Sequence, residues 1–145
     1  MTGTPGVVAR VPRTAWVVLL AAWCAATWKL SAQSDPESYV GVHLHLPDKL
    51  EHGIEYAAGG FLAAGALHGV FRVAGLRSWI APVICCTLWG VLDEIHQSFV
   101  PGRDSTGMDV AADVVGASIG TLAFAFAAGR RQPPRPAVDP TPGTK

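Results

Sequence analysis

The sequence predicts an all-α integral membrane protein with four transmembrane helices and both termini on the cytoplasmic side. Three observations lead to this fold class. Half of the 145 residues are hydrophobic, these residues gather in long runs, and basic residues flank the runs on one side of the predicted membrane. Lys and Arg balance Asp and Glu at 11 each, so the net charge favours no nucleic acid as a partner. The expected partner is the lipid bilayer.

Four apolar runs supply the four helices. A helix that crosses the hydrocarbon core needs about 20 mostly apolar residues, within a range of about 17–25. Three runs meet this length directly, at residues 14–30, 54–71 and 110–128. The remaining run, 79–92, meets it only if residues 93–97 form its last turn.

The runs also set the domain boundaries. Residues 14–128 form one membrane domain. The small and polar residues 1–13 are expected to be disordered, and the proline-rich residues 129–145 are expected to form a disordered cytoplasmic tail. The first run could instead be a cleaved signal peptide, although Trp28 and Lys29 fit poorly beside a cleavage site.

Basic residues orient the predicted helices. Short segments rich in Lys and Arg usually stay in the cytoplasm. Such residues precede the first run, lie between the second and third runs, and follow the fourth, as Arg10, Arg13, Arg72, Arg77, Arg130, Arg131 and Arg135. In a four-helix protein these three places lie on one side. The segments 34–47 and 99–107 are therefore predicted to face outward.

Polar stripes gather where three of the predicted helices reach the outer side. Helical spacing places polar or small residues on one face of each helix: Lys49, His52 and Tyr56; Gly90, Asp93 and Gln97; and Asp109, Asp113, Gly116 and Gly120. The glycine pair permits close helix contact. An ionisable group at mid-bilayer costs about 2.5–3.5 kcal/mol, so the stripes should face one another. They predict an outward-open pocket lined by Lys49, His52, Tyr56, Asp93, Glu94, Gln97, Arg103, Asp109 and Asp113.

The charges of this pocket need partners. Carboxylates at a helix C-terminus, such as Asp93 and Glu94, are disfavoured by the helix dipole. Lys49 and Arg103 can offset them, with His52 or His96 as a third cation. Arg103 could pair with Asp93 or Asp109, or its planar fork could hold an anionic ligand.

Two aspartates and the start of the second helix raise separate questions. Asp109 could be the N-cap of the fourth helix or part of the site. Asp113 lies a full turn further in, so capping does not explain it. Asp48 is expected to cap the second helix, with Glu51 as its capping-box partner.

A metal ion is an alternative way to neutralise the carboxylates. Asp93, Asp109 and Asp113 could hold a divalent cation, and His43 and His45 are further ligand candidates. The spacing matches no zinc-protease helix, so no cofactor is required. The sequence also lacks a nucleophile motif such as Gly-x-Ser-x-Gly. In an enzyme, Glu94 or His96 would be the general base.

These motifs closely resemble the VanZ-like family over residues 14–128. The resemblance rests on three strings, Asp48-Lys49-x-x-His52-x-x-x-Tyr56, Asp93-Glu94-x-His96-Gln97-x-Phe99-x-Pro101-Gly102-Arg103 and Asp109-x-x-x-Asp113-x-x-Gly116-x-x-x-Gly120. It implies a small, multi-pass protein of the bacterial inner membrane with a role in the cell envelope, since the name-giving member is an accessory factor in teicoplanin resistance. Family members often carry Asn at the position of Asp113, and this departure adds a potential negative charge.

Three functions remain open. The first is a non-catalytic protein that binds a lipid-linked or peptidic wall component, with Lys49 and Arg103 on an anionic group and Tyr56 and Gln97 orienting it. The second is a metal-assisted hydrolase or transferase acting on envelope precursors. The third is a small ion- or proton-coupled transporter that relays protons through Asp113 and His52. Four helices leave little room for alternating access, so a transporter would require a homo-oligomer.

Overall fold

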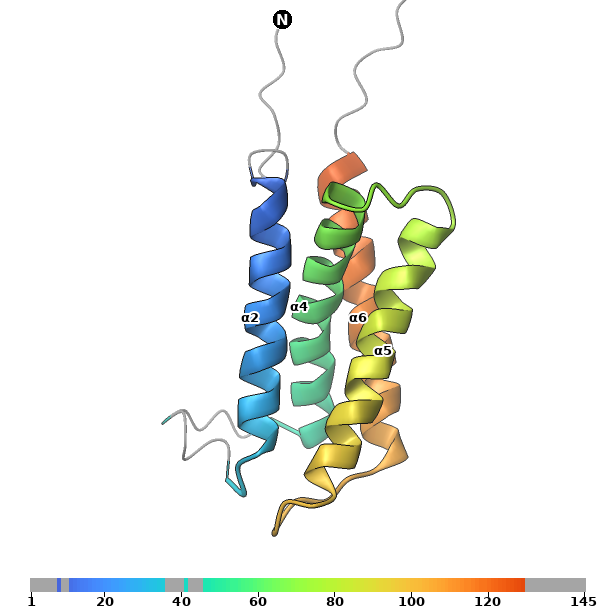
Figure 1. Ribbon diagram of the computed structural model, residues 1–145. Helices are drawn as coiled ribbons and strands as arrows, with labels where there is room; N and C mark the ends of the chain where they lie inside the picture. The colour runs from blue at the N-terminus through green and yellow to red at the C-terminus, as the bar shows by residue number, and fades with distance from the viewer. Residues whose placement is uncertain (1–7, 9–10, 36–40, 42–45, 130–145) are drawn as a thin grey trace, which may run out of the picture.

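The protein is all-helical in the part of the chain that the computed structural model describes, residues 8, 11–35, 41 and 46–129. These residues form four helices, α2 (Arg13–Ser31), α4 (Asp48–Gly69), α5 (Arg77–Gln97) and α6 (Gly107–Gly129) (Figure 1). Each helix matches one of the predicted apolar runs, and only the run 54–71 extends past its helix, which ends at Gly69. The disorder expected for residues 1–13 and 129–145 concerns residues that lie mostly outside the described ones.

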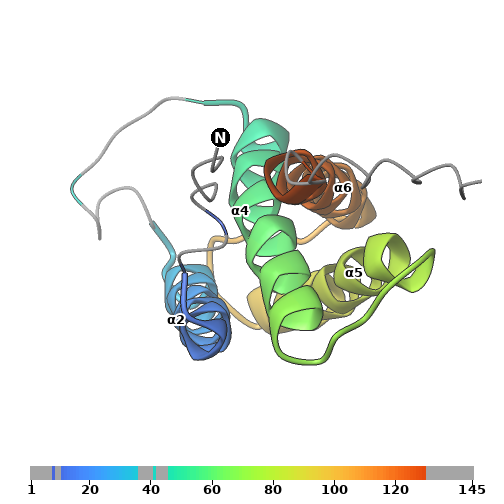
Figure 2. The same cartoon turned by 90° about the horizontal axis from the view of Figure 1, so that it is seen from above.

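Helix α4 is the centre of the bundle. It packs against each of the other three helices and lies between α2 on one side and α5 and α6 on the other (Figure 2). Its buried positions are mainly small residues, such as Gly59, Gly60, Ala63 and Ala64. Small side chains let neighbouring helices approach closely on several sides.

The contact between α4 and α6 is especially close. A Cβ atom on Gly116 would overlap the carbonyl oxygen of Gly53, and one on Gly120 would overlap that of Ala57. The same is true of a glycine on α4, because a Cβ on Gly60 would overlap the backbone of Ala117 on α6. The expectation that Gly116 and Gly120 permit close helix contact is confirmed.

Three of the described helices are long and apolar enough to cross a membrane, namely Arg13–Ser31, Arg77–Gln97 and Gly107–Ala128. Large apolar side chains such as Val18, Leu88 and Phe126 are exposed on them, as suits a surface in contact with lipid. Helix α4 is not apolar enough to belong to this group, although its apolar run was predicted to span the membrane. Because its neighbours enclose it, α4 needs fewer side chains that are soluble in lipid.

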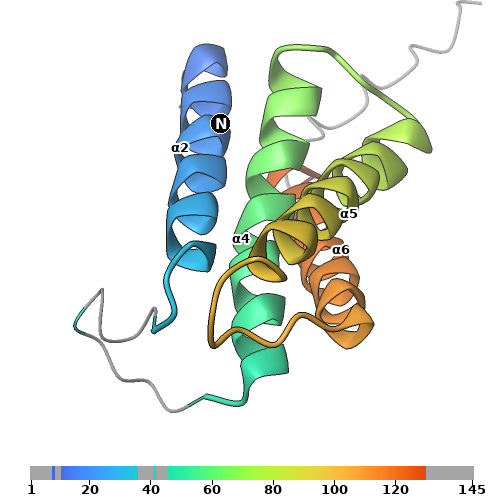
Figure 3. The same ribbon diagram turned by 60° about the horizontal axis from the view of Figure 1, so that its bottom comes forward.

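The helix ends divide into two groups. One end of the bundle holds the start of α2, the end of α4, the start of α5 and the end of α6 (Figure 1). The opposite end holds the end of α2, the start of α4, the end of α5 and the start of α6, with the α5–α6 connection running across it (Figure 3). Helix α5 includes residues 93–97, as the length argument required. All three polar stripes therefore reach the same end of the bundle, which we call the polar end.

Candidate functional site

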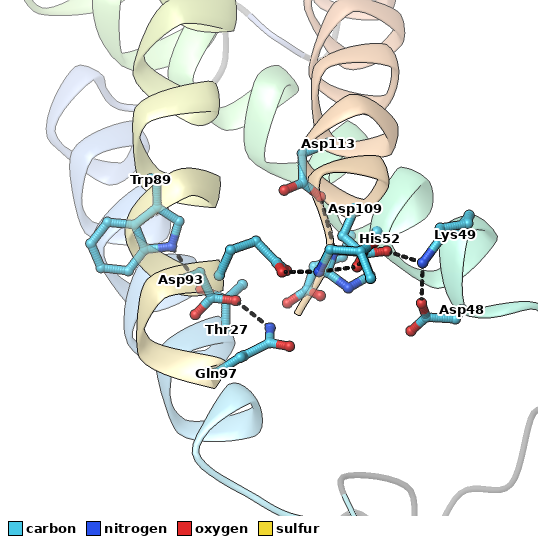
Figure 4. A network of polar contacts seen from close by, with 12 residues as sticks. Thr27, Asp48, Lys49, His52, Trp89, Asp93, Gln97, Asp109 and Asp113 are labelled. Carbon is cyan, nitrogen blue, oxygen red and sulfur yellow. Dashed lines mark hydrogen bonds and ion pairs between the residues drawn. The ribbon is translucent and has the colours of Figure 1, made fainter. Parts of the chain in front are cut away.

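A network of polar side chains fills the polar end between α4, α5 and α6 (Figure 4). It contains all nine residues that the sequence predicts for a pocket. Seven of these are buried, namely His52, Tyr56, Asp93, Glu94, Gln97, Asp109 and Asp113. The expected outward-open pocket is thus a mostly closed network, with Lys49 and Arg103 nearer to its surface.

Two ionic contacts join α4 to α6. His52 Nδ1 lies 3.0 Å from Asp113 Oδ1, and both side chains are buried. Lys49 Nζ pairs with Asp109 Oδ1 and, at 2.7 Å, with Asp48 Oδ2. These contacts give both aspartates of the α6 stripe a basic partner on α4, as the facing stripes require.

Asp109 also caps the start of α6, but from the third helical position. Its Oδ2 accepts hydrogen bonds from the Thr106 amide (3.1 Å) and the Thr106 hydroxyl (2.7 Å), and its own amide donates to the Thr106 carbonyl oxygen (3.0 Å). Asp109 thus supplies one half of a capping box, the carboxylate that accepts from the amide three residues earlier, while the Thr106 hydroxyl donates to the same carboxylate instead of capping the Asp109 amide. The expected cap at Asp48 is wrong, because Pro47 precedes α4 and no side-chain cap bond forms.

The α5 side of the network is a chain of hydrogen bonds. Gln97 Nε2 donates to Asp93 Oδ2 (2.9 Å), and Arg103 Nη2 donates to Gln97 Oε1 (2.8 Å). The expected pairing of Arg103 with Asp93 or Asp109 is therefore replaced by a bond to a neutral amide. Glu94 Oε2 accepts from the Thr106 amide at 3.0 Å, which ties the end of α5 to the start of α6.

His96 lies apart from the carboxylates. Its ring stacks on Trp28 of α2, with centroids 4.0 Å apart, and its Nδ1 lies 3.2 Å from Ser31 Oγ. On the same side, Trp89 Nε1 donates to Thr27 Oγ1 (3.0 Å). The sequence did not indicate these α2 partners, because they lie more than 60 residues from their contacts.

Four buried oxygen atoms in the network lack a hydrogen-bond partner among the described residues. They are Tyr56 Oη, Asp93 Oδ1, Glu94 Oε1 and Asp113 Oδ2. A Cβ atom on Gly90 would collide with Asp113 Oδ2 and lie 3.3 Å from Tyr56 Cε1, so Gly90 is what lets these two side chains meet beside α5. A buried polar group without a partner costs about 1–3 kcal/mol. Three of the four atoms are carboxylate oxygens, which only accept hydrogen bonds when ionised, and the fourth is the Tyr56 hydroxyl, which can also donate. The centre of the network therefore has more acceptors than donors.

The metal ligands suggested by the structure differ from the expected set. Asp48, His52 and Asp109 offer ligand atoms within 4.8 Å of one another, whereas the sequence indicated Asp93, Asp109 and Asp113. The Lys49 ammonium already pairs with both Asp48 and Asp109, and a cation there would have to displace it. His43 and His45 lie outside the described residues.

The two candidate general bases do not converge. Glu94 contacts the start of α6, and His96 contacts α2. The network as a whole can hold charges and accept hydrogen bonds, and these are properties of a binding site. Comparisons of the chain with models of protein families, with curated proteins and with solved structures find no match.

Proposed function

We propose that the chain is a VanZ-like, multi-pass protein of the bacterial inner membrane that binds a lipid-linked or peptidic wall component without catalysing a reaction. The proposal rests on one observation above all: α5 and α6 bring buried carboxylate oxygens that lack a donor among the described residues to the same end of the bundle, beside the Tyr56 hydroxyl of α4. Most residues of this network also carry the resemblance to VanZ-like proteins, so the proposed family and the proposed site concern the same side chains.

The ligand group that suits this site is a hydrogen-bond donor. Oxygen atoms of Asp93, Glu94 and Asp113 are free to accept, and hydrogen bonds between ions are the strong ones. An ammonium group, or a cluster of N–H groups on a peptidic wall component, would supply both charge and donors. The basic residues Lys49 and Arg103 are engaged within the network, so an anionic group would have to compete for them.

A binding role fits the geometry better than catalysis. Ser31 and His96 are within hydrogen-bond distance, but Ser31 is 4% exposed and also donates to the Trp28 carbonyl oxygen (3.1 Å). Because the single hydroxyl proton of Ser31 is donated to a backbone carbonyl, His96 is not placed to remove it as a general base would. The metal-assisted alternative retains one specific observation, the grouping of Asp48, His52 and Asp109.

A pair of model ligands tests the binding proposal. The probes are a synthetic wall peptide with a free side-chain amine and the same peptide with that amine acetylated. We expect the full chain in lipid nanodiscs to bind the amine form, and Asp93→Asn to weaken binding about tenfold, the size of one charge-assisted hydrogen bond. Asp104→Asn is the matched control, because Asp104 is exposed on the adjoining loop. Equal binding of both peptides, or unchanged binding by Asp93→Asn, would contradict the proposal.

We further propose that all four helices span the membrane with both termini in the cytoplasm. The support is the antiparallel bundle, with Arg13, Arg72 and Arg77 at the end opposite the polar end. A periplasm-active reporter should then be silent after Gly75 and Lys145 and active after Gly102. If α4 stays outside the membrane, all three results reverse.

A further inference from the structure

A cavity lies at the end of the bundle opposite the polar end, between the start of α2 and the ends of α4 and α6. Its volume is about 330 Å³. Trp16 and Phe124 line it, both buried and in edge-to-face contact with ring centroids 5.6 Å apart. Gly65 makes room for this arrangement, because a Cβ there would overlap the Trp16 ring. The cavity therefore has an aromatic, apolar floor.

Basic side chains surround this floor. Arg13 of α2, His68 of α4 and Arg72, just beyond α4, all line the cavity and are exposed. Residues 11–34, 56–92 and 114–129 contain no Asp or Glu, so no carboxylate from these described segments neutralises the three basic groups. The acidic side chains of the helices lie in the first turns of α4, at the end of α5 and at the start of α6. Among the described residues, the cavity is thus lined by basic groups with no carboxylate beside them.

The conformation of Arg72 is a separate observation. Its φ angle is +54°, in the left-handed region where glycine is the usual residue after a helix. A non-glycine residue there carries strain, and strained residues concentrate at functional sites. Cationic residues at a helix C-terminus are common and can simply orient a protein in its membrane. Membrane orientation accounts for the positive charge of Arg72. It does not account for the strained backbone of an arginine beside an apolar cavity floor.

We propose that this cavity binds the headgroup of an anionic phospholipid. Arg13 and Arg72 would contact the phosphate oxygens, and Trp16 and Phe124 would contact the glycerol and first acyl carbons. Basic pockets between membrane helices are suited to anionic lipid headgroups, and the apolar floor favours a lipid over a soluble phosphate. The inference is independent of the ligand at the polar end, since it concerns the other end of the bundle.

Arg72→Gly is the sharpest variant for a test. It removes the guanidinium and replaces the strained residue with the one that its backbone favours, so folding should be unchanged or improved. Arg77→Ala is the matched control, because Arg77 is an exposed arginine at the same end that does not line the cavity. Arg13→Ala tests the other side of the cavity without touching the α4 terminus.

The measurement is native mass spectrometry of the full chain with phosphatidylglycerol and phosphatidylcholine of identical acyl chains. We expect one tightly held phosphatidylglycerol on the wild type and on Arg77→Ala, and about fivefold weaker retention for Arg72→Gly and for Arg13→Ala. Equal retention of the two lipids by the wild type, or undiminished phosphatidylglycerol on both cavity variants, would overturn the proposal. Displacement of the lipid by millimolar glycerol phosphate would also overturn the proposal, because the site would then bind a phosphate group regardless of any acyl chain.

Discussion

The close approach of α4 and α6 makes a quantitative prediction about two glycines of one interface. A Cβ on Gly120 would overlap the Ala57 carbonyl oxygen and lie 2.8 Å from the Phe61 nitrogen. A Cβ on Gly53 would meet only the Ala112 carbonyl oxygen, at an ordinary 3.9 Å. The same substitution, glycine to alanine, should therefore have different consequences at the two positions.

The expected magnitude follows from two terms. Replacing a helical glycine by alanine gains about 1 kcal/mol from helix propensity, and this gain is common to both variants. Overpacking costs about 1–3 kcal/mol. The obstructing atoms at Gly120 belong to the backbone and cannot rotate away, so the upper half of that range applies. Gly120→Ala should be less stable than Gly53→Ala by about 2–3 kcal/mol, and Gly53→Ala should match or exceed the wild type.

The assay is reversible unfolding of the full chain in mixed micelles by titration with SDS, followed by tryptophan fluorescence and by circular dichroism. The difference between the two alanine variants isolates the steric term, because the propensity terms cancel. If the variants agree within about 0.5 kcal/mol, the usual error of such comparisons, the close packing of α4 on α6 is refuted.

Three further predictions concern the polar end. Asp113→Ala leaves the buried His52 without its partner and should cost about 3 kcal/mol in the same titration, whereas Asp113→Asn keeps an acceptor and should cost less; a loss for Asp113→Ala below about 0.5 kcal/mol would show that the contact is unimportant. Thr106→Ala removes the hydrogen bond from the Thr106 hydroxyl to Asp109 Oδ2 and should cost about 1 kcal/mol, which Thr106→Ser should restore. EDTA should leave the thermal midpoint unchanged, because Lys49 already pairs with the carboxylates of the metal-like group; a lowered midpoint would favour the metal-assisted alternative.

The helices were largely predictable from the sequence. Apolar run length located all four, and the minimum length of a span correctly required α5 to continue through Asp93 to Gln97. The start of α4 was predicted to within one residue, although the apolar run begins six residues later, because Asp48 was expected to cap the helix. The low hydropathy of α4 is explained by its three neighbouring helices. The sequence of α4 alone does not show that these neighbours enclose it.

The site was predictable as a set of residues but not as a set of bonds. Spacing along one helix shows which side chains share a face, so Lys49 and His52 could be matched with the facing stripe of α6. Partners across helices depend on helix rotation and on the path of the loops. For that reason the bond from Arg103 to Gln97 and the contact of His96 with Ser31 could not be foreseen.

The enclosed position of α4 has a consequence for biogenesis. Helices α2, α5 and α6 carry enough apolar surface to partition into lipid individually, whereas α4 begins with Asp48, Lys49 and Glu51 and is rich in glycine. In the proposed topology, α4 can leave the translocon stably only when neighbouring helices are there to receive it. Insertion of the second span would then be cooperative with the fourth, and a nascent chain would acquire its final topology late, after α6 has been synthesised.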